Sequence, residues 1–174
     1  MGMDVYGSDP TTEHGVYFRN NVWWWRPLWE YAITVGSEVI SEQLAESGHY
    51  NDGSGLNADQ AKRLGEILFI ELWEGRTLQY QSEYNQALAS LERQPCNLCS
   101  ETGIRTDSLG VEMGQPTKEL SPEVQILTGR THGWCNGCNG VGTVEHFAAH
   151  YPFSVENVAN FAQFCIESGG FKIC

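Results

Sequence analysis

The sequence predicts an α+β fold that is mainly helical, in which a small cysteine-bearing β-hairpin module is inserted into a helical domain. Three observations predict it. Apolar residues recur at helical spacing in four stretches of the chain. The N-terminal segment lacks that period, and so does the stretch 96–144, which holds four of the six cysteines. The length of 174 residues fits one domain with a small insert. We therefore expect a helical domain over 1–95 and 145–174, with the module over 96–144.

The N-terminal segment up to residue 25 is predicted to be extended or irregular. Turn formers occupy 7–10, and the run VYFRNNVWWW that follows is rich in aromatic residues without a helical period. In an extended chain Trp23 and Trp25 share one side, and Trp24 points to the other. We therefore expect Trp24 to differ in environment from its neighbours, whereas Trp23, Trp25 and Trp29 serve the core.

The first helix is predicted to begin near Pro27, which fits the first turn because its missing N–H is not needed there. Apolar residues at helical spacing continue it to about Glu46. The segment GHYNDGSGL at 48–56 is predicted to be a loop, since Asn-Asp-Gly and Ser-Gly favour turns.

Two further helices follow this loop. Asn57 is the expected N-cap of the second, with Gln60 at the third helical position and Gly75 at its end. Its expected buried stripe consists of Leu64, Ile67, Leu68 and Leu72. The third helix runs from about Thr77 to Arg93, and Pro95 prevents its continuation.

A last helix is predicted after Ser154, its N-cap, and should end at Gly169 and Gly170. Phe153 and Val158 stand at the positions of a hydrophobic staple. Cys165 falls on the apolar face and is expected to be a buried thiol.

Charge and hydropathy argue against a nucleic-acid-binding protein and against a membrane protein. The formal net charge is −12, and the ten Lys and Arg residues are scattered, so no basic stripe suits nucleic acid. No stretch reaches the length of a membrane span, and the first residues do not resemble a signal peptide. We expect a cytoplasmic protein whose partner is a protein, with no direct contact to nucleic acid or membrane.

Two CxxC pairs carry the strongest chemical signal in the chain. In CNLCSETG and CNGCNGVG each tight turn points two sulfurs at one spot, and two turns complete a tetrahedral site. We predict one structural Zn²⁺ bound by Cys96, Cys99, Cys135 and Cys138. Four thiolates leave no position for water, so this zinc is not catalytic. An iron–sulfur cluster, unligated thiols and disulfides are the alternatives.

These motifs resemble the CxxCxGxG repeats of the DnaJ-type cysteine-rich domain over about 96–142. The second copy is complete with Gly140 and Gly142, whereas the first has Glu101 in place of its inner glycine and keeps Gly103. The resemblance implies that each copy runs into a short hairpin, with 103–106 and 142–146 paired antiparallel. It also implies binding of unfolded peptides, although no J-domain or HPD tripeptide is present.

The rest of the chain resembles a family of uncharacterised bacterial and bacteriophage proteins. The shared features are a DVYG start, YFRNNVWWWRPLWEY, the NDGSGL loop, the cysteine pairs and a YPFSVENV helix ending in SGGF. This resemblance implies a bacterial or phage-encoded source and brings no activity with it.

The aromatic block is the best candidate for a binding surface outside the cysteines. Its aromatic and Arg side chains are of the type that anchors interfaces, but packing in the core is the interpretation that we favour for most of them. The candidate binding residues are Tyr17, Arg19, Asn20, Asn21, Trp24 and Asp52. Calcium in the loop at Asn51, Asp52, Asn57 and Asp59 is a weaker alternative without EF-hand spacing.

The sequence favours an interaction protein over an enzyme. No phosphate-binding glycine loop, GxSxG motif or HExxH motif occurs, and His146 and His150 lie in the run HFAAH without an acid. We expect a zinc-stabilised protein that presents an acidic, aromatic-containing surface to a protein partner. An enzyme or small-ligand binder with a pocket near the tryptophans, and a DnaJ-like peptide-binding module, are the alternatives.

Overall fold

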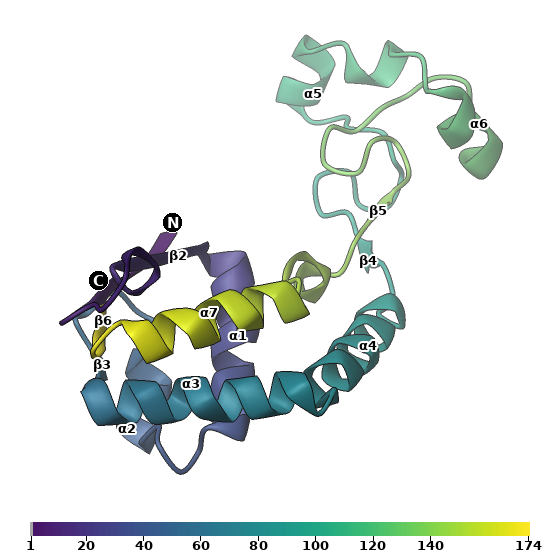
Figure 1. The fold of residues 1–174 in the computed structure, drawn as a ribbon. Helices are drawn as coiled ribbons and strands as arrows, with labels where there is room; N and C mark the ends of the chain where they lie inside the picture. The colour runs from purple at the N-terminus through teal and green to yellow at the C-terminus, as the bar shows by residue number, and fades with distance from the viewer. Residues whose placement is uncertain (1) are drawn as a thin grey trace. The chain divides into compact units, whose positions relative to one another are not determined.

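The computed structural model describes residues 2–174, and its fold is α+β, as the sequence predicted. The chain divides into two compact units. The first contains the residues up to Ala89 together with His150–Cys174, and the second is Ser90–Ala149. Figure 1 shows the helices and strands of each unit.

The first unit is built from helices packed against a small sheet. Its strands are β1 (Gly2–Gly7), β2 (Tyr17–Asn21), β3 (Gly55–Leu56) and β6 (Phe171–Ile173). Its helices are the short 3-10 turn η1 (Glu13–Gly15), α1 (Val22–Val35), α2 (Glu42–Ser47), α3 (Ala58–Trp73), α4 (Arg76–Ala89) and α7 (Val155–Glu167).

The sheet joins the two ends of the described chain. Its strand order is β2-β1-β6-β3, and every neighbouring pair is antiparallel. Val5 of β1 lies opposite Ile173 of β6, and both side chains are fully buried. Strand β6 therefore closes the first unit after the chain has passed through the second.

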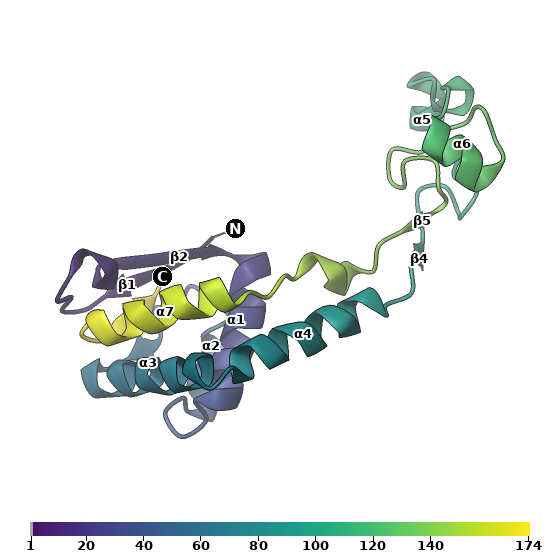
Figure 2. The same ribbon diagram turned by 45° about the vertical axis from the view of Figure 1, so that its right-hand side comes forward.

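Helix α7 packs along α3, and the two lie side by side in both ribbon views (Figures 1 and 2). Gly65 allows this approach, because a Cβ there would come within 2.8 Å of the Ala162 carbonyl oxygen. Large aromatic rings fill the adjoining core. Trp25 and Trp29 stack with ring centroids 5.4 Å apart, and Phe161 meets Trp25 edge-on at 5.6 Å.

The prediction that the tryptophan run is extended is wrong. Asn21 caps α1 by accepting hydrogen bonds from the backbone amides of Trp23 and Trp24, so the helix begins at Val22. The three indoles therefore follow helical rather than strand geometry. Trp25 is fully buried and Trp24 half-buried, whereas Trp23, expected in the core, is 36% exposed.

The expected first helix is also wrong in its bounds. Pro27 lies in the second turn of α1 rather than the first, where the helix tolerates the loss of one backbone hydrogen bond. The helix stops at Val35, and the short helix α2 is separate, with Ser41 as its N-cap. Gly36 lies at the break, because a Cβ there would approach Leu64 Cδ1 to 2.5 Å.

The later helices of the first unit begin where their sequence signals predicted. Asn57 and Gln60 form a reciprocal capping box at the start of α3, and Gly75 follows its end with a positive φ of 75°. Ser154 caps α7 through the backbone amide of Asn157. Helix α4 ends at Ala89, four residues before the expected Arg93.

The second unit contains short elements around the cysteine pairs. These are β4 (Gln94–Pro95), α5 (Ser108–Glu112), the 3-10 turn η2 (Gln115–Thr117), α6 (Pro122–Thr128), β5 (Thr143–Val144) and the 3-10 turn η3 (Phe147–His150), which ends at the border with the first unit. The expected pairing of 103–106 with 142–146 is wrong. Strand β5 pairs instead with β4, which precedes the first cysteine.

Within residues 2–174, no helix is both long and apolar enough to cross a membrane.

Candidate metal centre

Four buried cysteine sulfurs from the second unit converge on one point. The Sγ atoms of Cys96, Cys99, Cys135 and Cys138 all lie within 4.8 Å of one another. Cys96 Sγ is 3.9 Å from Cys135 Sγ, and Cys99 Sγ is 3.7 Å from Cys138 Sγ. A tetrahedral ion with metal–sulfur bonds of about 2.3 Å separates its ligands by about 3.8 Å, so the cluster has the spacing of a four-thiolate metal site.

The two cysteine pairs form equivalent turns. In each turn the amide of the second cysteine donates to the carbonyl of the first, at 3.4 Å for Cys99 and 3.3 Å for Cys138. The amide four residues beyond each second cysteine then donates to its sulfur, from Gly103 at 3.3 Å and from Gly142 at 3.2 Å. Such amide–sulfur bonds stabilise thiolate charge, as a metal ligand requires.

Glycine at these two positions allows the turns to pack together. A Cβ on Gly142 would come within 2.3 Å of the Glu101 carbonyl oxygen, and one on Gly103 within 2.3 Å of the Gly140 carbonyl oxygen. The backbone amide of Cys96 also donates to the Gly142 carbonyl at 2.9 Å. The two turns therefore hold each other directly, through backbone atoms of both motifs.

Without a cation, the surroundings of the cluster favour the neutral thiol form of Cys99 and Cys135 over the thiolate. Burial raises the pKa of the Cys99 thiol to about 12 and also raises the pKa of Cys135. At Cys96 burial acts in the same direction, but the Leu98 amide and the neighbouring sulfurs outweigh it and lower the pKa. Four buried thiols at one point thus call for a bound positive charge, which is what favours thiolates.

The other two cysteines lie in the first unit and outside this cluster. Cys165 is fully buried on α7, as predicted, and burial raises its pKa well above the ordinary value. Cys174 is exposed, and both residues are free thiols. The four clustered cysteines are likewise free of disulfide bonds.

The predicted binding residues of β2 divide between its two faces. Tyr17 and Arg19 meet at Asp4 of β1, where the Tyr17 hydroxyl donates to the carboxylate and Arg19 pairs with it at 3.5 Å. The Asp4 carboxylate raises the pKa of Tyr17 through this hydrogen bond. Asn20 faces the other way and donates to the side chain of Asn157 on α7 at 2.9 Å.

The remaining candidates have local partners. Asn21 is the N-cap of α1, and the half-buried Trp24 offers its carbonyl to Asn157 at 3.5 Å. Asp52 accepts a hydrogen bond from the Ser54 amide at 2.9 Å. The side chain of Ser54, and after it this amide, lowers the pKa of Asp52 by hydrogen bonding. The structure brings Tyr17 and Arg19 together but gives each of the six a contact that stabilises the fold. Their role in binding stays a prediction.

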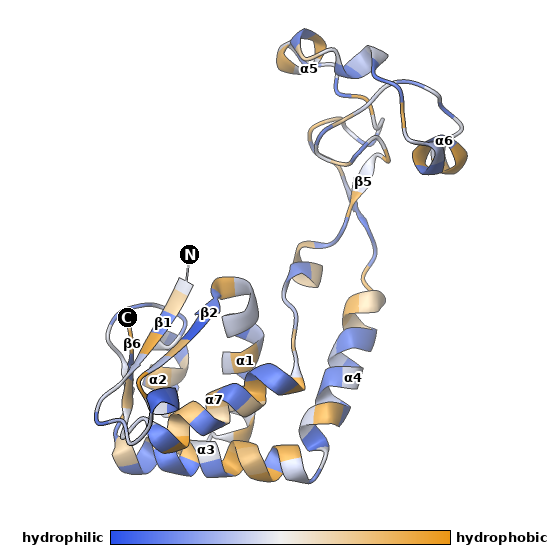
Figure 3. Cartoon of the chain, turned by 45° about the horizontal axis from the view of Figure 1, so that its top comes forward, coloured by the Kyte–Doolittle hydropathy of each residue, from blue (hydrophilic) through white to orange (hydrophobic). Residues whose placement is uncertain are grey.

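The most exposed aromatic side chain among residues 2–174 belongs to a residue that the sequence did not mark as a site. Trp73 at the end of α3 is 91% exposed, and the neighbouring Ile70 and Phe69 are 47% and 38% exposed. These three residues, called the α3 patch below, lie on one face because positions three and four apart are neighbours on a helix. The signal was the nearly continuous apolar run 67–73, which is too wide for a single buried stripe. Figure 3 shows hydrophobic residues continuing to this end of α3.

No protein-family model, no curated protein and no solved structure matches the chain. The DnaJ-type and phage-family resemblances therefore gain no support beyond the residues that suggested them.

Proposed function

We propose that the protein is a zinc-stabilised binding protein that docks on a basic protein partner through the α3 patch. The observation that carries the docking surface is the exposure of Trp73, the most exposed of the large hydrophobic side chains described. An exposed tryptophan leaves a large apolar surface in contact with water. Burial of this surface against a partner would contribute favourably to the free energy of binding.

Zinc is the metal that best suits the donor set. Four thiolates select zinc or iron among common ions, and zinc prefers the closed tetrahedral arrangement whose sulfur spacing the cluster has. The four protein ligands would fill its coordination, so the ion would stabilise the second unit rather than take part in a reaction. Cys96 and Cys99 would thereby be joined to Cys135 and Cys138 across the excursion that separates them.

The α3 patch has the composition of an interface centre. Tryptophan and other aromatic residues are enriched among the side chains that contribute most to binding, and apolar neighbours exclude water from them. Carboxylates lie next to it on the same helix, at Glu66 and at Glu74 just after its end. Arg63 and Arg76 already form ion pairs with these carboxylates.

Net charge favours a basic partner protein over a second copy of the chain at the α3 patch. The chain has a formal net charge of −12, so two copies repel each other, whereas a partner with Lys and Arg around an apolar pocket is attracted. A basic partner would therefore match the net charge of the whole chain, since Glu66 and Glu74 beside the patch are already paired. Trp73, rather than the N-terminal tryptophans, would make the aromatic contact.

The test is affinity capture with the intact protein, followed by binding measurements on the purified partner. Trp73→Ser and Ile70→Ser should each weaken binding by at least about 30-fold, the effect of losing a central interface residue. Tyr50→Ser is the matched control, because Tyr50 is a 63% exposed aromatic residue of the same unit outside the patch. Binding to a basic partner should also weaken as salt increases.

Two results would contradict the proposal. One is a captured partner whose affinity is unchanged by Trp73→Ser and Ile70→Ser. The other is a wild-type protein that sediments as a dimer while Trp73→Ser sediments as a monomer, since the patch would then be covered by a second copy.

A further inference from the structure

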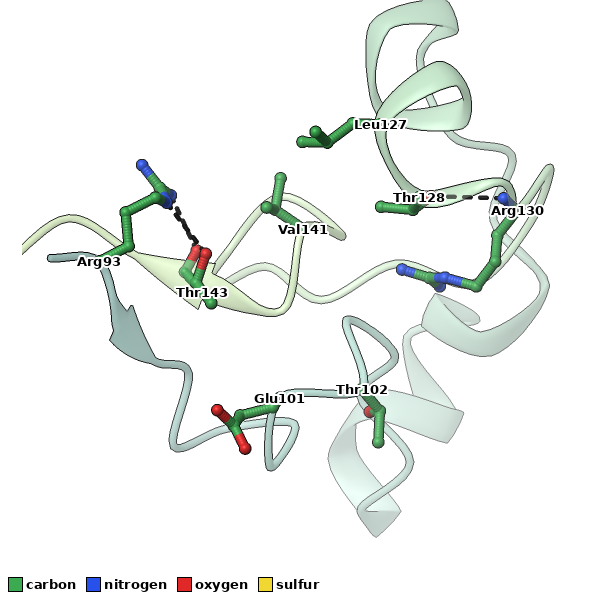
Figure 4. A pocket seen from close by; sticks show the side chains of 8 residues that line it. All are labelled: Arg93, Glu101, Thr102, Leu127, Thr128, Arg130, Val141 and Thr143. Carbon is green, nitrogen blue, oxygen red and sulfur yellow. Dashed lines mark hydrogen bonds between the residues drawn. The ribbon is translucent and has the colours of Figure 1, made fainter.

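A hollow of about 680 Å³ opens in the second unit, on the side of the two cysteine turns. Thr102 and Val141, which line it, stand at equivalent positions, each three residues beyond the second cysteine of its pair. Leu127 and Thr128 of α6 line another part, and Arg93, Arg130, Glu101 and Thr143 complete the wall (Figure 4). The hollow thus has an apolar part and two cationic groups.

Both guanidinium groups are held in place by hydrogen bonds to neutral acceptors. Arg93 donates to the hydroxyl and to the carbonyl of Thr143, each at 2.9 Å. Arg130 donates to the carbonyl of Gly133 at 3.0 Å and to that of Gly140. A guanidinium has five N–H donors, so each arginine keeps donors for a ligand.

Neither arginine is neutralised by the protein. Among residues 2–174, no carboxylate forms an ion pair with Arg93 or Arg130, although the chain has 22 acidic residues and only ten Lys and Arg. Figure 4 shows the two guanidinium groups on opposite sides of the hollow, with Leu127 and Val141 between them. Positioned arginines without a carboxylate partner are suited to bind an anionic oxygen group.

We infer that this hollow binds a peptide segment in which an apolar side chain lies next to carboxylates. The carboxylates pair with Arg93 and Arg130, and the apolar side chain packs on Leu127, which is 68% exposed, and on Val141. The volume is within the range of sites that take groups of this size. The site is in the second unit and does not use the α3 patch, so it stands independently of the proposed docking surface.

The charge of the chain favours a short peptide over nucleic acid. A polyphosphate backbone would place many negative charges beside a protein of net charge −12, whereas two arginines can neutralise only two of them. Glu101 at the edge of the hollow can accept hydrogen bonds from peptide N–H groups, which a nucleic-acid backbone lacks.

The test measures fluorescence anisotropy of short labelled peptides with the full-length, metal-bound protein. One peptide carries a central Glu-Leu-Glu between blocked ends, a second ends in a leucine with a free carboxylate, and a third carries Gln-Leu-Gln between blocked ends. We expect the first or second peptide to bind and the third to bind at least about tenfold more weakly. The first two peptides distinguish side-chain carboxylates from a chain end.

Substitutions then locate the binding. Arg93→Gln and Leu127→Ser should each weaken binding of the carboxylate peptide, Arg93→Gln by about tenfold. Lys118→Gln removes the same charge from the same unit at a residue outside the hollow, and Ile126→Ser is the neighbouring, 87% exposed control on α6. Both controls should bind as the wild type does. Arg130→Gln is a second charge variant. Because Arg130 holds the backbone at Gly140 and Arg93 holds it at Thr143, Leu127→Ser is the variant that leaves these backbone contacts in place.

Three outcomes would overturn the inference. The Gln-Leu-Gln peptide could bind as well as the carboxylate peptides, which would exclude recognition of carboxylates. Lys118→Gln could weaken binding as much as Arg93→Gln does. The net charge of the protein, rather than contact with Arg93, would then explain the weaker binding. Finally, neither carboxylate peptide could show saturable binding.

Discussion

Glu101 and Gly140 occupy the same position in the two cysteine turns, and both have a left-handed backbone, with φ of 64° and 86°. The preceding residues, Ser100 and Asn139, are left-handed as well, with φ of 47° and 52°. The first turn therefore adopts the conformation of the second although it lacks the inner glycine. Glu101 replaces the glycine of the motif but keeps its left-handed backbone conformation. This conformation strains the backbone at a residue that carries a side chain.

Replacing Glu101 by glycine should remove this strain. We expect Glu101→Gly to stabilise the folded second unit by roughly 1 kcal/mol and so to raise its metal affinity by about fivefold. Competition with a colorimetric chelator measures the change. Gly140→Ala should move the affinity in the opposite direction, because alanine is strained at its φ of 86°. Equal affinities for all three proteins would contradict the strain argument.

Gly142 should tolerate no side chain. A Cβ there lies 2.3 Å from the Glu101 carbonyl oxygen, and moving the backbone would break the amide bond to Cys138 Sγ. We expect Gly142→Ala to lower metal affinity by at least about tenfold, as for the loss of other groups that support metal ligands. Gly114→Ala is the matched control, since Gly114 also has a positive φ, of 68°, but nothing within 4 Å. An equal effect of both changes would assign the loss to backbone strain alone.

Trp25 and Trp23 should respond differently to truncation. Trp25 is fully buried, stacks on Trp29 and donates its indole N–H to the Gly48 carbonyl at 2.8 Å. Trp25→Ala should therefore lower the free energy of unfolding by roughly 3–5 kcal/mol. Trp23, at 36% exposure, leaves a smaller cavity and should give a clearly smaller loss. Thermal and denaturant unfolding of both variants, compared with the wild type, checks this order.

Glu167 should make stability depend on acid pH. The Thr12 hydroxyl, and then Gln163, bind its carboxylate and lower its pKa below the ordinary 4.5. A group with a lowered folded-state pKa stabilises the protein above its unfolded-state pKa, and this stabilisation disappears as pH falls through the folded-state pKa. Glu167→Gln should flatten the pH dependence of unfolding over that acid range, and Thr12→Val should reduce it. A pH profile unchanged by both substitutions would contradict the assignment.

Much of the first unit followed from local signals. Asn57, Gln60 and Ser154 marked helix starts because capping depends on a few neighbouring residues, and Cys165 was placed in the core by helical spacing. The tryptophan run was misread because one residue, Asn21, caps a helix where the aromatic composition suggested a strand. Trp73 was missed because periodicity identifies a buried stripe but does not show where the packed neighbours end.

The candidate site was predictable to a similar degree. Close spacing within each CxxC pair identified all four clustered cysteines, since a local turn brings the two sulfurs together. The partner of β5 was not predictable, because it depends on how the chain enters the module at Gln94 and Pro95. Arg93 precedes the first cysteine pair, Leu127 and Arg130 lie around the end of α6, and Val141 follows the second cysteine pair. Only the folded chain brings these three segments to one hollow.

Thiol labelling should separate the cysteines into three classes. In the native metal-bound protein, only the exposed Cys174 should react with a maleimide. A chelator should release the four clustered thiols for reaction, while Cys165 stays protected until the first unit unfolds, because it is fully buried. Mass spectrometry of the labelled peptides identifies each class. Reaction of all four clustered cysteines before chelation would contradict metal ligation.

The metal content of the intact protein tests the central claim most directly. Native mass spectrometry together with elemental analysis should find one zinc ion per chain in the wild type, and Cys135→Ser should lose it. The wild-type zinc should also leave as the solution is acidified, because protons compete for the thiolates. A metal content near zero, two metals per chain, or iron in place of zinc would contradict a single closed zinc site.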